Sequence, residues 1–295
     1  MLSLCRVGLG LFLCCVQINA SAAALRPYVV DVQIKQPVVK EGNYYIDLLT
    51  MILNASKAPD EVIEFRYYED QISQARWIAA VEKDKGNSVM WTMTNKEREK
   101  DLHAVRVPLY KGLMGYRLLI IRNTDEQKFA KVKTKEDLKA LVAGQGTHWP
   151  DSTILRWNKF QLIEAMTKEN LYKMLAAKRF DFFPRGAIEI ITENDLIREH
   201  NLLVEPHLVL YYKTDLYYFV NKKNTELANR LEKGWEIILQ NGEFDKLFYS
   251  TDRVKFAMEL IKQPGRIIIE LENPLLPGDT PLQAPGYWLD HSNFR

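Results

Sequence analysis

An arginine stands at the end of an apolar strand in the stretch FDFFPRG, residues 180–186. The aromatic run predicts a buried strand, and Pro184 and Gly186 predict its end. Ligands of α/β proteins bind beyond the carboxyl ends of the strands, so Arg185 is a candidate to hold an acidic group. The alternative is that Arg185 forms an ion pair on the surface or inside its own lobe.

A second candidate is the turn in GQGTHWPD, residues 144–151. A strand ends at Gly146 and Thr147, and Pro150 opens a helix. Free backbone N–H groups and the helix dipole favour an anion at such a turn, and the glycines allow a close approach of the backbone. Thr147 is therefore a candidate ligand-binding residue. An ordinary glycine-rich turn is the alternative.

Aromatic side chains occur in the same regions. Trp91 ends a strand of the first half of the chain, and His148 and Trp149 follow Thr147. Flat rings can stack on a planar or sugar-like part of a ligand, so we include these three as candidates. Packing in the core is the competing interpretation for each ring taken singly.

Several kinds of catalytic site have no signature in the sequence. The five histidines have no metal-ligand spacing, and there is no nucleophile elbow, P-loop or dinucleotide fingerprint. We therefore expect no metal, no cofactor and no enzymatic activity. If the protein is an enzyme, Glu164, Asp181 and His148 are the nominal general acids.

The first residues predict export. A short basic segment precedes the apolar run at residues 7–18, and ASA at residues 20–22 matches a signal-peptidase site. Cleavage after Ala22 removes all three cysteines, Cys5, Cys14 and Cys15, so no disulfide is expected. Removing Arg6 leaves 40 − 1 = 39 basic against 38 acidic residues, which argues against nucleic-acid binding. We expect a periplasmic, monomeric protein.

The elements that position the candidate residues alternate between strand and helix patterns. Residues 61–69 alternate strictly as a strand, whereas residues 44–56 have helical spacing. This order predicts parallel-sheet α/β units. Two long extended segments, 115–123 and 215–221, bracket the second unit, which predicts an inserted lobe held by two hinge strands. The predicted organisation is a signal peptide at 1–22, lobe 1 at 23–122, lobe 2 at 123–215, a return to lobe 1 at 216–250, and an extension at 251–295 packed on lobe 1.

Four motifs resemble those of the amino-acid-type periplasmic solute-binding proteins, family 3. The stretch from residue 224 to 250 resembles their C-terminal signature, and YYIDLLTMI resembles their first helix. TNKEREKDLHAVRVPLYKG and KTKEDLKALVAGQGT are similar to the turn after their third strand and to the start of their second lobe. The set covers the chain to about residue 250. The resemblance implies a type II periplasmic binding fold, with two α/β lobes around a ligand cleft.

The resemblance also implies roles for individual residues. Arg98 matches the family arginine that grips a ligand carboxylate, although its spacing from Thr94 is one residue longer, and a structural salt bridge is the alternative. The family threonine that helps bind the same carboxylate corresponds to Thr147. The family acid that takes the ligand's amino group falls on Gly186, beside Arg185. This departure predicts a ligand with a second acidic or strongly accepting group rather than an ordinary amino acid.

The resulting hypothesis is a periplasmic protein that closes over a small polar or anionic ligand and serves an ABC-type transporter or a sensor. One alternative is a dehydratase-like enzyme on the same fold. Another is a protein-interaction module that uses the proline- and leucine-rich extension.

Overall fold

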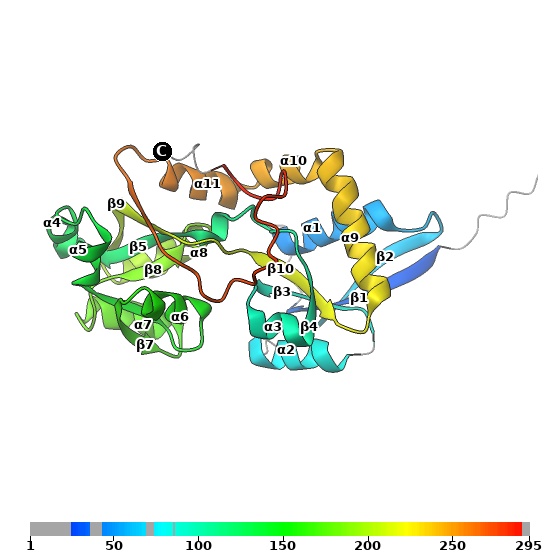
Figure 1. Cartoon of the computed structure of the whole chain (residues 1–295), viewed down its shortest axis with the longest axis horizontal. Helices are drawn as coiled ribbons and strands as arrows, with labels where there is room; N and C mark the ends of the chain where they lie inside the picture. The colour runs from blue at the N-terminus through cyan, green and yellow to red at the C-terminus, as the bar shows by residue number, and fades with distance from the viewer. Residues whose placement is uncertain (1–24, 36–42, 69–73, 85, 291–295) are drawn as a thin grey trace, which may run out of the picture.

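The computed structural model describes residues 25–35, 43–68, 74–84 and 86–290, and these form two α/β lobes side by side along the long axis (Figure 1). The predicted signal peptide and its cleavage site lie outside the described residues. Among the helices of the described part of the chain, none is both long enough and apolar enough to cross a bilayer.

Lobe 1 contains a five-stranded sheet in the order β2-β1-β3-β10-β4. The strands β1 and β2 are parallel, as are β1 and β3, whereas β10 runs antiparallel to both of its neighbours. Its strands are β1 (Arg26–Lys35), β2 (Glu61–Tyr68), β3 (Ser88–Met93), β4 (Leu102–Val105) and β10 (Leu216–Asn221). Its helices are α1 (Tyr44–Ser56), α2 (Gln74–Lys83), α3 (Lys96–Asp101), α9 (Thr225–Gln240) and α10 (Glu243–Ser250).

Lobe 2 contains a four-stranded sheet, β11-β9-β5-β8, and a two-stranded sheet, β6-β7. A parallel bridge between Ala143 and Phe182 joins the two. The strands are β5 (Tyr116–Arg122), β6 (Val142–Gly146), β7 (Gln161–Ala165), β8 (Phe183–Gly186), β9 (Leu202–Tyr211) and β11 (Ile267–Glu270). The helical elements are η2 (Asn123–Asp125), α4 (Glu126–Phe129), α5 (Lys135–Lys139), α6 (Pro150–Trp157), α7 (Lys168–Ala176), α8 (Ile190–Glu199) and α11 (Asp252–Ile261). A short 3₁₀ turn, η1 (Leu113–Gly115), precedes β5.

Local sequence sets several helix starts. Thr134 and Asp137 form a capping box at α5, and Asn95 accepts a hydrogen bond from the Arg98 N–H at α3. Pro150 opens α6, where its missing N–H costs nothing. In lobe 1, α9 crosses α1 so closely that a Cβ on Gly234 would lie 2.1 Å from the Ile52 carbonyl oxygen.

The lobes connect at other points than the sequence predicts. Strand β5 pairs with β9 over its whole length and with β8 from Arg117 to Ile120, and β10 lies wholly in the sheet of lobe 1. The two predicted hinge strands therefore each belong to one lobe. The chain crosses instead at residues 106–115, the first connection, and at residues 212–215, the second connection. The boundary predicted at residue 122 lies too far along the chain.

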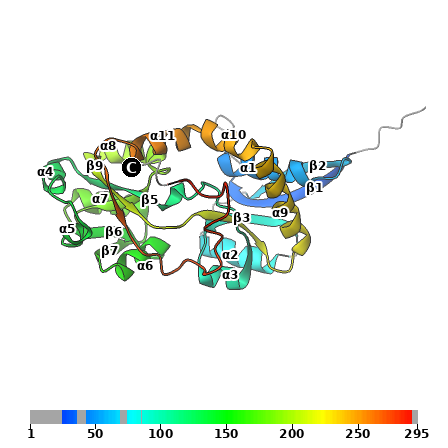
Figure 2. The same cartoon turned by 45° about the horizontal axis from the view of Figure 1, so that its top comes forward.

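The C-terminal extension is not confined to lobe 1. Strand β11 pairs in parallel with β9 of lobe 2, with Ile267 opposite Leu208. The helix α11 packs against α8 of the same lobe. Figure 2 shows the end of the chain passing from lobe 2 back to lobe 1 as a separate red trace.

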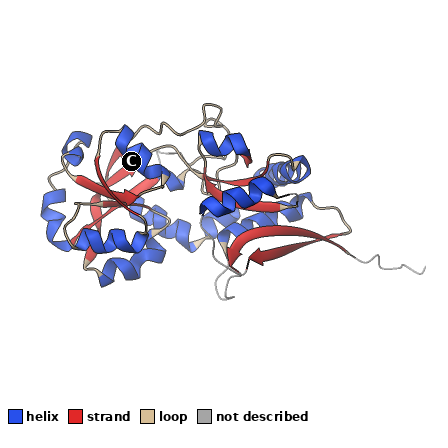
Figure 3. Cartoon of the chain, turned by 90° about the horizontal axis from the view of Figure 1, so that it is seen from below, coloured by secondary structure: helices blue, strands red, loops and turns tan. Residues whose placement is uncertain are grey.

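One buried apolar cluster extends through both lobes. It includes Leu109, Tyr110 and Leu113 of the first connection, each with no exposed surface, and the nearly buried Tyr212 of the second. The connections are therefore packed segments. The view from below shows the two lobes with loops passing between them (Figure 3).

Candidate functional site

Arg185 lies at the carboxyl end of β8, almost completely buried, and its guanidinium pairs with acids of its own lobe. Its Nε and Nη2 donate to the two carboxylate oxygens of Glu193 at 2.8 and 2.7 Å, and Nη2 also donates to Glu189 at 2.8 Å. Trp149 covers it, with the guanidinium carbon 4.9 Å from the ring centroid. Burial lowers the pKa of Arg185, but Glu189 and Glu193 outweigh burial and raise it above its ordinary value.

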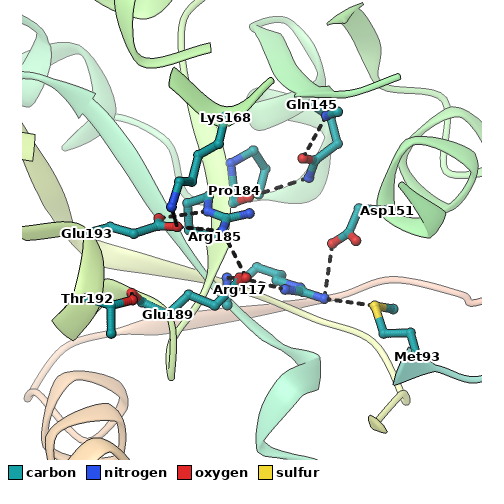
Figure 4. A network of polar contacts seen from close by, with 12 residues as sticks. Met93, Arg117, Gln145, Asp151, Lys168, Pro184, Arg185, Glu189, Thr192 and Glu193 are labelled. Carbon is teal, nitrogen blue, oxygen red and sulfur yellow. Dashed lines mark hydrogen bonds and ion pairs between the residues drawn. The ribbon is translucent and has the colours of Figure 1, made fainter. Parts of the chain in front are cut away.

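Glu193 is the centre of this group. Besides Arg185, it accepts a hydrogen bond from the Tyr172 hydroxyl at 2.7 Å and lies 3.3 Å from the Lys168 ammonium. Burial raises the pKa of Glu193, but the hydrogen bonds from Arg185 lead a set of contacts that lower it overall. The carboxylate is therefore the buried counter-ion of Arg185 (Figure 4).

A second arginine, Arg117 of β5, lies where the two lobes meet. Its Nε donates to the Tyr212 hydroxyl at 2.7 Å, and its Nη2 lies 3.1 Å from Asp151 of α6. The same Nη2 lies 3.6 Å from the sulfur of Met93, at the end of β3 in lobe 1. Its Nη1 lies 3.4 Å from Glu189. Arg117 therefore links β3 of lobe 1, the second connection and two helix starts of lobe 2 (Figure 4).

The network of Arg117 and Arg185 is balanced in charge. Its basic members are Arg117, Lys168 and Arg185, and its acidic members are Asp151, Glu189 and Glu193. Three charges of each sign neutralise one another within the protein. The side chain of Glu189 is 29% exposed, so it is the acid of this network that solvent reaches most easily.

Arg98 of α3 is different, because it has no acidic partner among the described residues. Its Nη1 donates to the carbonyl of Met93, the residue whose sulfur contacts Arg117. Its Nε is buried and has no hydrogen-bond partner within the described structure. Burial lowers the pKa of Arg98 to about 10, with no carboxylate to offset the loss of hydration. The guanidinium is incompletely satisfied, and its partner Met93 is the residue through which lobe 1 contacts Arg117.

In the glycine turn after β6, the N–H groups of Gly146 and Thr147, which were the predicted anion-binding donors, donate to other groups of the protein. The Gly146 N–H donates to the Gln145 side chain at 3.0 Å, and the Thr147 N–H donates to the Ala165 carbonyl at 3.1 Å. The Thr147 side chain is half-buried beside them. Gly146 is required by packing, since a Cβ there would lie 2.3 Å from the Trp149 ring.

The predicted aromatic candidates lie in three different environments. Trp149 packs on Gly146 and Arg185, whereas His148 is exposed on the turn. Trp91 stacks on Tyr45 inside lobe 1, with ring centroids 4.9 Å apart and planes 16° apart. The structure therefore brings Arg185 and Trp149 together, whereas Trp91 belongs to a separate aromatic cluster. Arg98 is linked to Arg185 indirectly, through Met93, Arg117 and Glu189.

The sequence-based prediction lacks most of the interlobe network, including Arg117, Asp151, Lys168, Glu189, Glu193 and Tyr212. A usable signal existed for Arg117, which interrupts the apolar strand YRLLIIR. The four-residue spacing of Arg185, Glu189 and Glu193 was a second signal. Asp151 and Tyr212 carry no comparable mark in the sequence.

The nominal general acids have other partners. Asp181 accepts from Lys128 at 2.7 Å and from the Val142 N–H at 2.8 Å. Burial raises the pKa of Asp181, but Lys128 and that N–H lower it overall. Glu164 pairs with Arg156. Within the described residues, no group of three histidine, cysteine or acidic side chains is arranged to hold a metal ion.

Two cavities lie on lobe 1. One of about 550 Å³ lies between α9 and the C-terminal segment, and is lined by Trp235, Leu239 and Tyr287 among others. The other, of about 640 Å³, is lined by residues from the end of α2 and the start of α9. Neither includes Arg98, Arg117 or Arg185.

Comparison with known proteins places the fold. No family model matches the sequence, and no curated protein matches it significantly. Solved structures do match. A probable amino-acid ABC transporter extracellular-binding protein from Bacillus subtilis has a TM-score of 0.57 at 15% identity, covering 79% of this chain and 100% of that one.

This chain has the type II periplasmic binding protein fold.

Two further structures with this fold illustrate its range of uses. A histidine kinase sensor domain with similarity to periplasmic binding proteins matches with a TM-score of 0.51 at 16% identity, over 77% of this chain and 96% of that one. An ancestral amino acid-binding protein, a precursor of cyclohexadienyl dehydratase, matches with 0.50 at 14% identity, over 76% and 94%. The predicted fold class is confirmed, and the likeness to family 3 structures holds at the level of the fold.

Proposed function

We propose that this protein is a solute-binding protein whose small ligand lies between the lobes and presents an anionic group to Arg98. Two of the matched structures are described as amino-acid-binding proteins, which supports solute binding as the general function. The ligand itself is a proposal from this chain's residues, since fold likeness alone does not specify a site.

The observation that carries the proposal is the unsatisfied guanidinium of Arg98. A buried donor without a partner costs about 1–3 kcal/mol, and more when it is charged. A ligand carboxylate or similar planar anion would satisfy the Nε and offset the lost hydration through two parallel hydrogen bonds. The contact through Met93 puts this group next to Arg117, where lobe 1 meets lobe 2.

The charge balance refines the ligand class. Arg185 was expected to face a second acidic group, but Glu193 and Glu189 occupy the hydrogen bonds of its Nε and Nη2. Glu189 accepts from Arg185 and from the Gly186 N–H, both at 2.8 Å, but its carboxylate is 29% exposed and has lone pairs left for a donor on the ligand. We therefore infer a polar ligand with one anionic group and at least one hydrogen-bond donor, a class that includes zwitterions.

The rest of the proposal concerns the cellular role. The predicted signal peptide supports delivery to the periplasm, and the matched structures include both a transporter-associated binding protein and a sensor domain. We propose that closure of the lobes is read by a membrane transporter or by a sensor. Catalysis has less support, because Asp181 and Glu164 pair with basic residues and His148 is exposed.

Native mass spectrometry of the freshly purified protein tests the proposal by identifying any ligand that is carried along. A panel of carboxylates, zwitterions and neutral sugars in a thermal-shift assay follows, with Arg98→Ala beside the wild type. Arg179→Ala, an exposed arginine of lobe 2, is the matched control. The proposal is wrong if no carboxylate or zwitterion raises the melting temperature, or if Arg98→Ala keeps the full shift.

A further inference from the structure

The last part of the chain is attached to lobe 2 before it turns back. After β11, the Leu271 N–H donates to the Tyr211 carbonyl at 2.7 Å. Asn158, at the end of α6, then holds Glu272 from both sides. Its Nδ2 donates to the Glu272 carbonyl at 2.7 Å, and its Oδ1 accepts from the Glu272 N–H at 3.1 Å. These bonds fix residues 271 and 272 to lobe 2.

The chain then crosses to lobe 1 within a few residues. The Lys96 N–H donates to the Leu275 carbonyl at 3.3 Å, and the Lys96 ammonium donates to the Pro274 carbonyl at 3.1 Å. Four residues further on, Asp279 lies 2.6 Å from Nη1 of Arg106. Residues 274–279 are therefore attached at α3 and at the start of the first connection.

The end of the segment closes on the first connection itself. The Leu289 N–H donates to the Lys111 carbonyl at 2.8 Å, and the buried Lys111 ammonium donates to the Gly286 carbonyl. Trp288 covers Gly112 so closely that a Cβ there would lie 2.7 Å from the indole ring. Gly112 has φ = 82°, so a side chain would be strained as well.

We propose that residues 271–289 form a strap that restrains the relative movement of the two lobes. Two-lobed proteins open about the few residues that connect the lobes. Here the strap is attached to lobe 2 at one end, to lobe 1 in the middle and to the first connection at the other end. Opening pulls on the chain segment between Glu272 and Pro274. This segment is too short to span a large separation of the lobes.

The strap has a consequence for the site. Arg98 belongs to α3, the same helix that the strap contacts through Lys96. The strap therefore sets the distance between Arg98 and lobe 2. This consequence for ligand entry rests on the proposed function, whereas the restraint on the lobes does not. The strap acts as a positioning segment, and its release widens the space between the lobes.

The experiment measures the interlobe distance without any ligand. The chain from Ala23 has no cysteine, so Lys57→Cys in lobe 1 and Lys173→Cys in lobe 2 give one exposed label site each. Double electron–electron resonance between spin labels on these two cysteines then gives the distribution of interlobe distances. With the strap intact we expect one narrow distribution. With Asn158→Ala and Lys96→Ala combined, which remove the side-chain attachments on either side of the link between Glu272 and Pro274, we expect a broader distribution that extends to longer distances.

The controls separate loss of the strap from loss of the fold. Gln283→Ala changes an exposed strap residue and should keep the narrow distribution. Circular dichroism checks that each variant is folded, and a chain that ends at Leu271 provides a second way to remove the strap. A folded variant of either kind with the wild-type distribution overturns the proposal, as does a broad distribution in the wild type. The protein is first unfolded in urea, dialysed and refolded to remove any ligand carried from the cells, so these results do not depend on whether Arg98 binds an anion.

Discussion

Arg185 and Glu193 form two parallel hydrogen bonds inside lobe 2, at 2.8 and 2.7 Å, with both side chains more than nine-tenths buried. A guanidinium at the end of a strand is therefore a structural cation here. Its partner lies on the helix that follows, so the local chain carries its own counter-ion.

Removing either partner of this pair should destabilise the protein strongly. A buried charge left without its partner costs about 3–5 kcal/mol, whereas replacing both by apolar residues is often close to neutral. We expect Arg185→Leu and Glu193→Leu each to lower the free energy of unfolding by about that amount, and the double variant to lose less than the sum.

Urea unfolding of the four proteins measures this coupling. Arg198→Leu is the matched control, since its pair with Asp195 is exposed and should matter by no more than about 0.5 kcal/mol. If the loss of stability in the double variant equalled the sum of the losses in the two single variants, the two side chains would not form a coupled buried pair. If Arg185→Leu left the stability unchanged but weakened ligand binding, Arg185 would be a ligand-binding residue and not a structural cation.

Much of the fold could be predicted from the sequence because it follows from local periodicity. The alternation in residues 61–69 and the helical spacing in residues 44–56 correspond to β2 and α1. The points where the chain crosses between the lobes could not be predicted, because the apolar sequence of β5 does not specify which sheet the strand joins. The path of β11 depends on contacts with β9, about 60 residues earlier in the chain, which no local pattern reports.

The site was predictable only in part, for a related reason. Arg185 and Thr147 stand at the ends of strands and Arg98 lies in the short helix α3, so their positions follow once the element order is known. Whether a charge faces a ligand or an internal partner depends on side chains from several elements. Arg185 and Arg98 have the same chemistry, but only Arg185 has Glu193 beside it.

Substitution of Arg98 should weaken ligand binding while leaving stability nearly unchanged. Each hydrogen bond to a charged group contributes about 1.5–3 kcal/mol, so Arg98→Ala should lower affinity roughly 10- to 150-fold. In the free protein, Arg98→Ala removes the bond from Nη1 to the Met93 carbonyl but also the unsatisfied Nε, so we expect a loss of no more than about 1 kcal/mol of stability. Isothermal titration with the ligand identified by mass spectrometry checks the affinity.

Arg98→Lys is the informative companion variant. Lysine keeps the charge but not the planar pair of donors, so we expect an intermediate affinity. Equal affinity in the lysine variant and the wild type would mean that the anion is held by charge alone. An unchanged affinity in the alanine variant would remove Arg98 from the site.

Asp215 should make stability depend on pH. Its carboxylate has no exposed surface and accepts from the N–H groups of Tyr110 and Leu216 at 3.1 and 2.6 Å, and from that of Gly112. Burial raises the pKa of Asp215 to about 7 against these hydrogen bonds, from about 3.9 in an unfolded chain. The folded state then holds a proton that the unfolded state releases, so this carboxyl's contribution is full below pH 4 and is lost as the pH rises through 7.

Asp215→Asn isolates that contribution, because the amide does not titrate. We expect the stability of the wild type relative to this variant to fall by roughly 2–3 kcal/mol between pH 5 and pH 8, at 1.36 kcal/mol per pKa unit. Urea unfolding at both pH values measures the difference. A difference that does not change with pH, or that grows as the pH rises, would show that the native carboxyl keeps an ordinary or lowered pKa.

Gly115 allows the two interlobe connections to touch, and a methyl group there should force them apart. A Cβ at this position would lie 2.2 Å from the Tyr212 carbonyl oxygen, which is backbone and cannot rotate away. The Tyr212 N–H donates to the Gly115 carbonyl at 3.3 Å, so the shift would also stretch this bond. We expect Gly115→Ala to lower the free energy of unfolding by about 1–3 kcal/mol and to lengthen the distance between spin labels on the two lobes.

Gly278→Ala is the control, since a Cβ there meets nothing within 4 Å. If Gly115→Ala matched this control in both stability and interlobe distance, the connections would not be packed against each other as the structure has them.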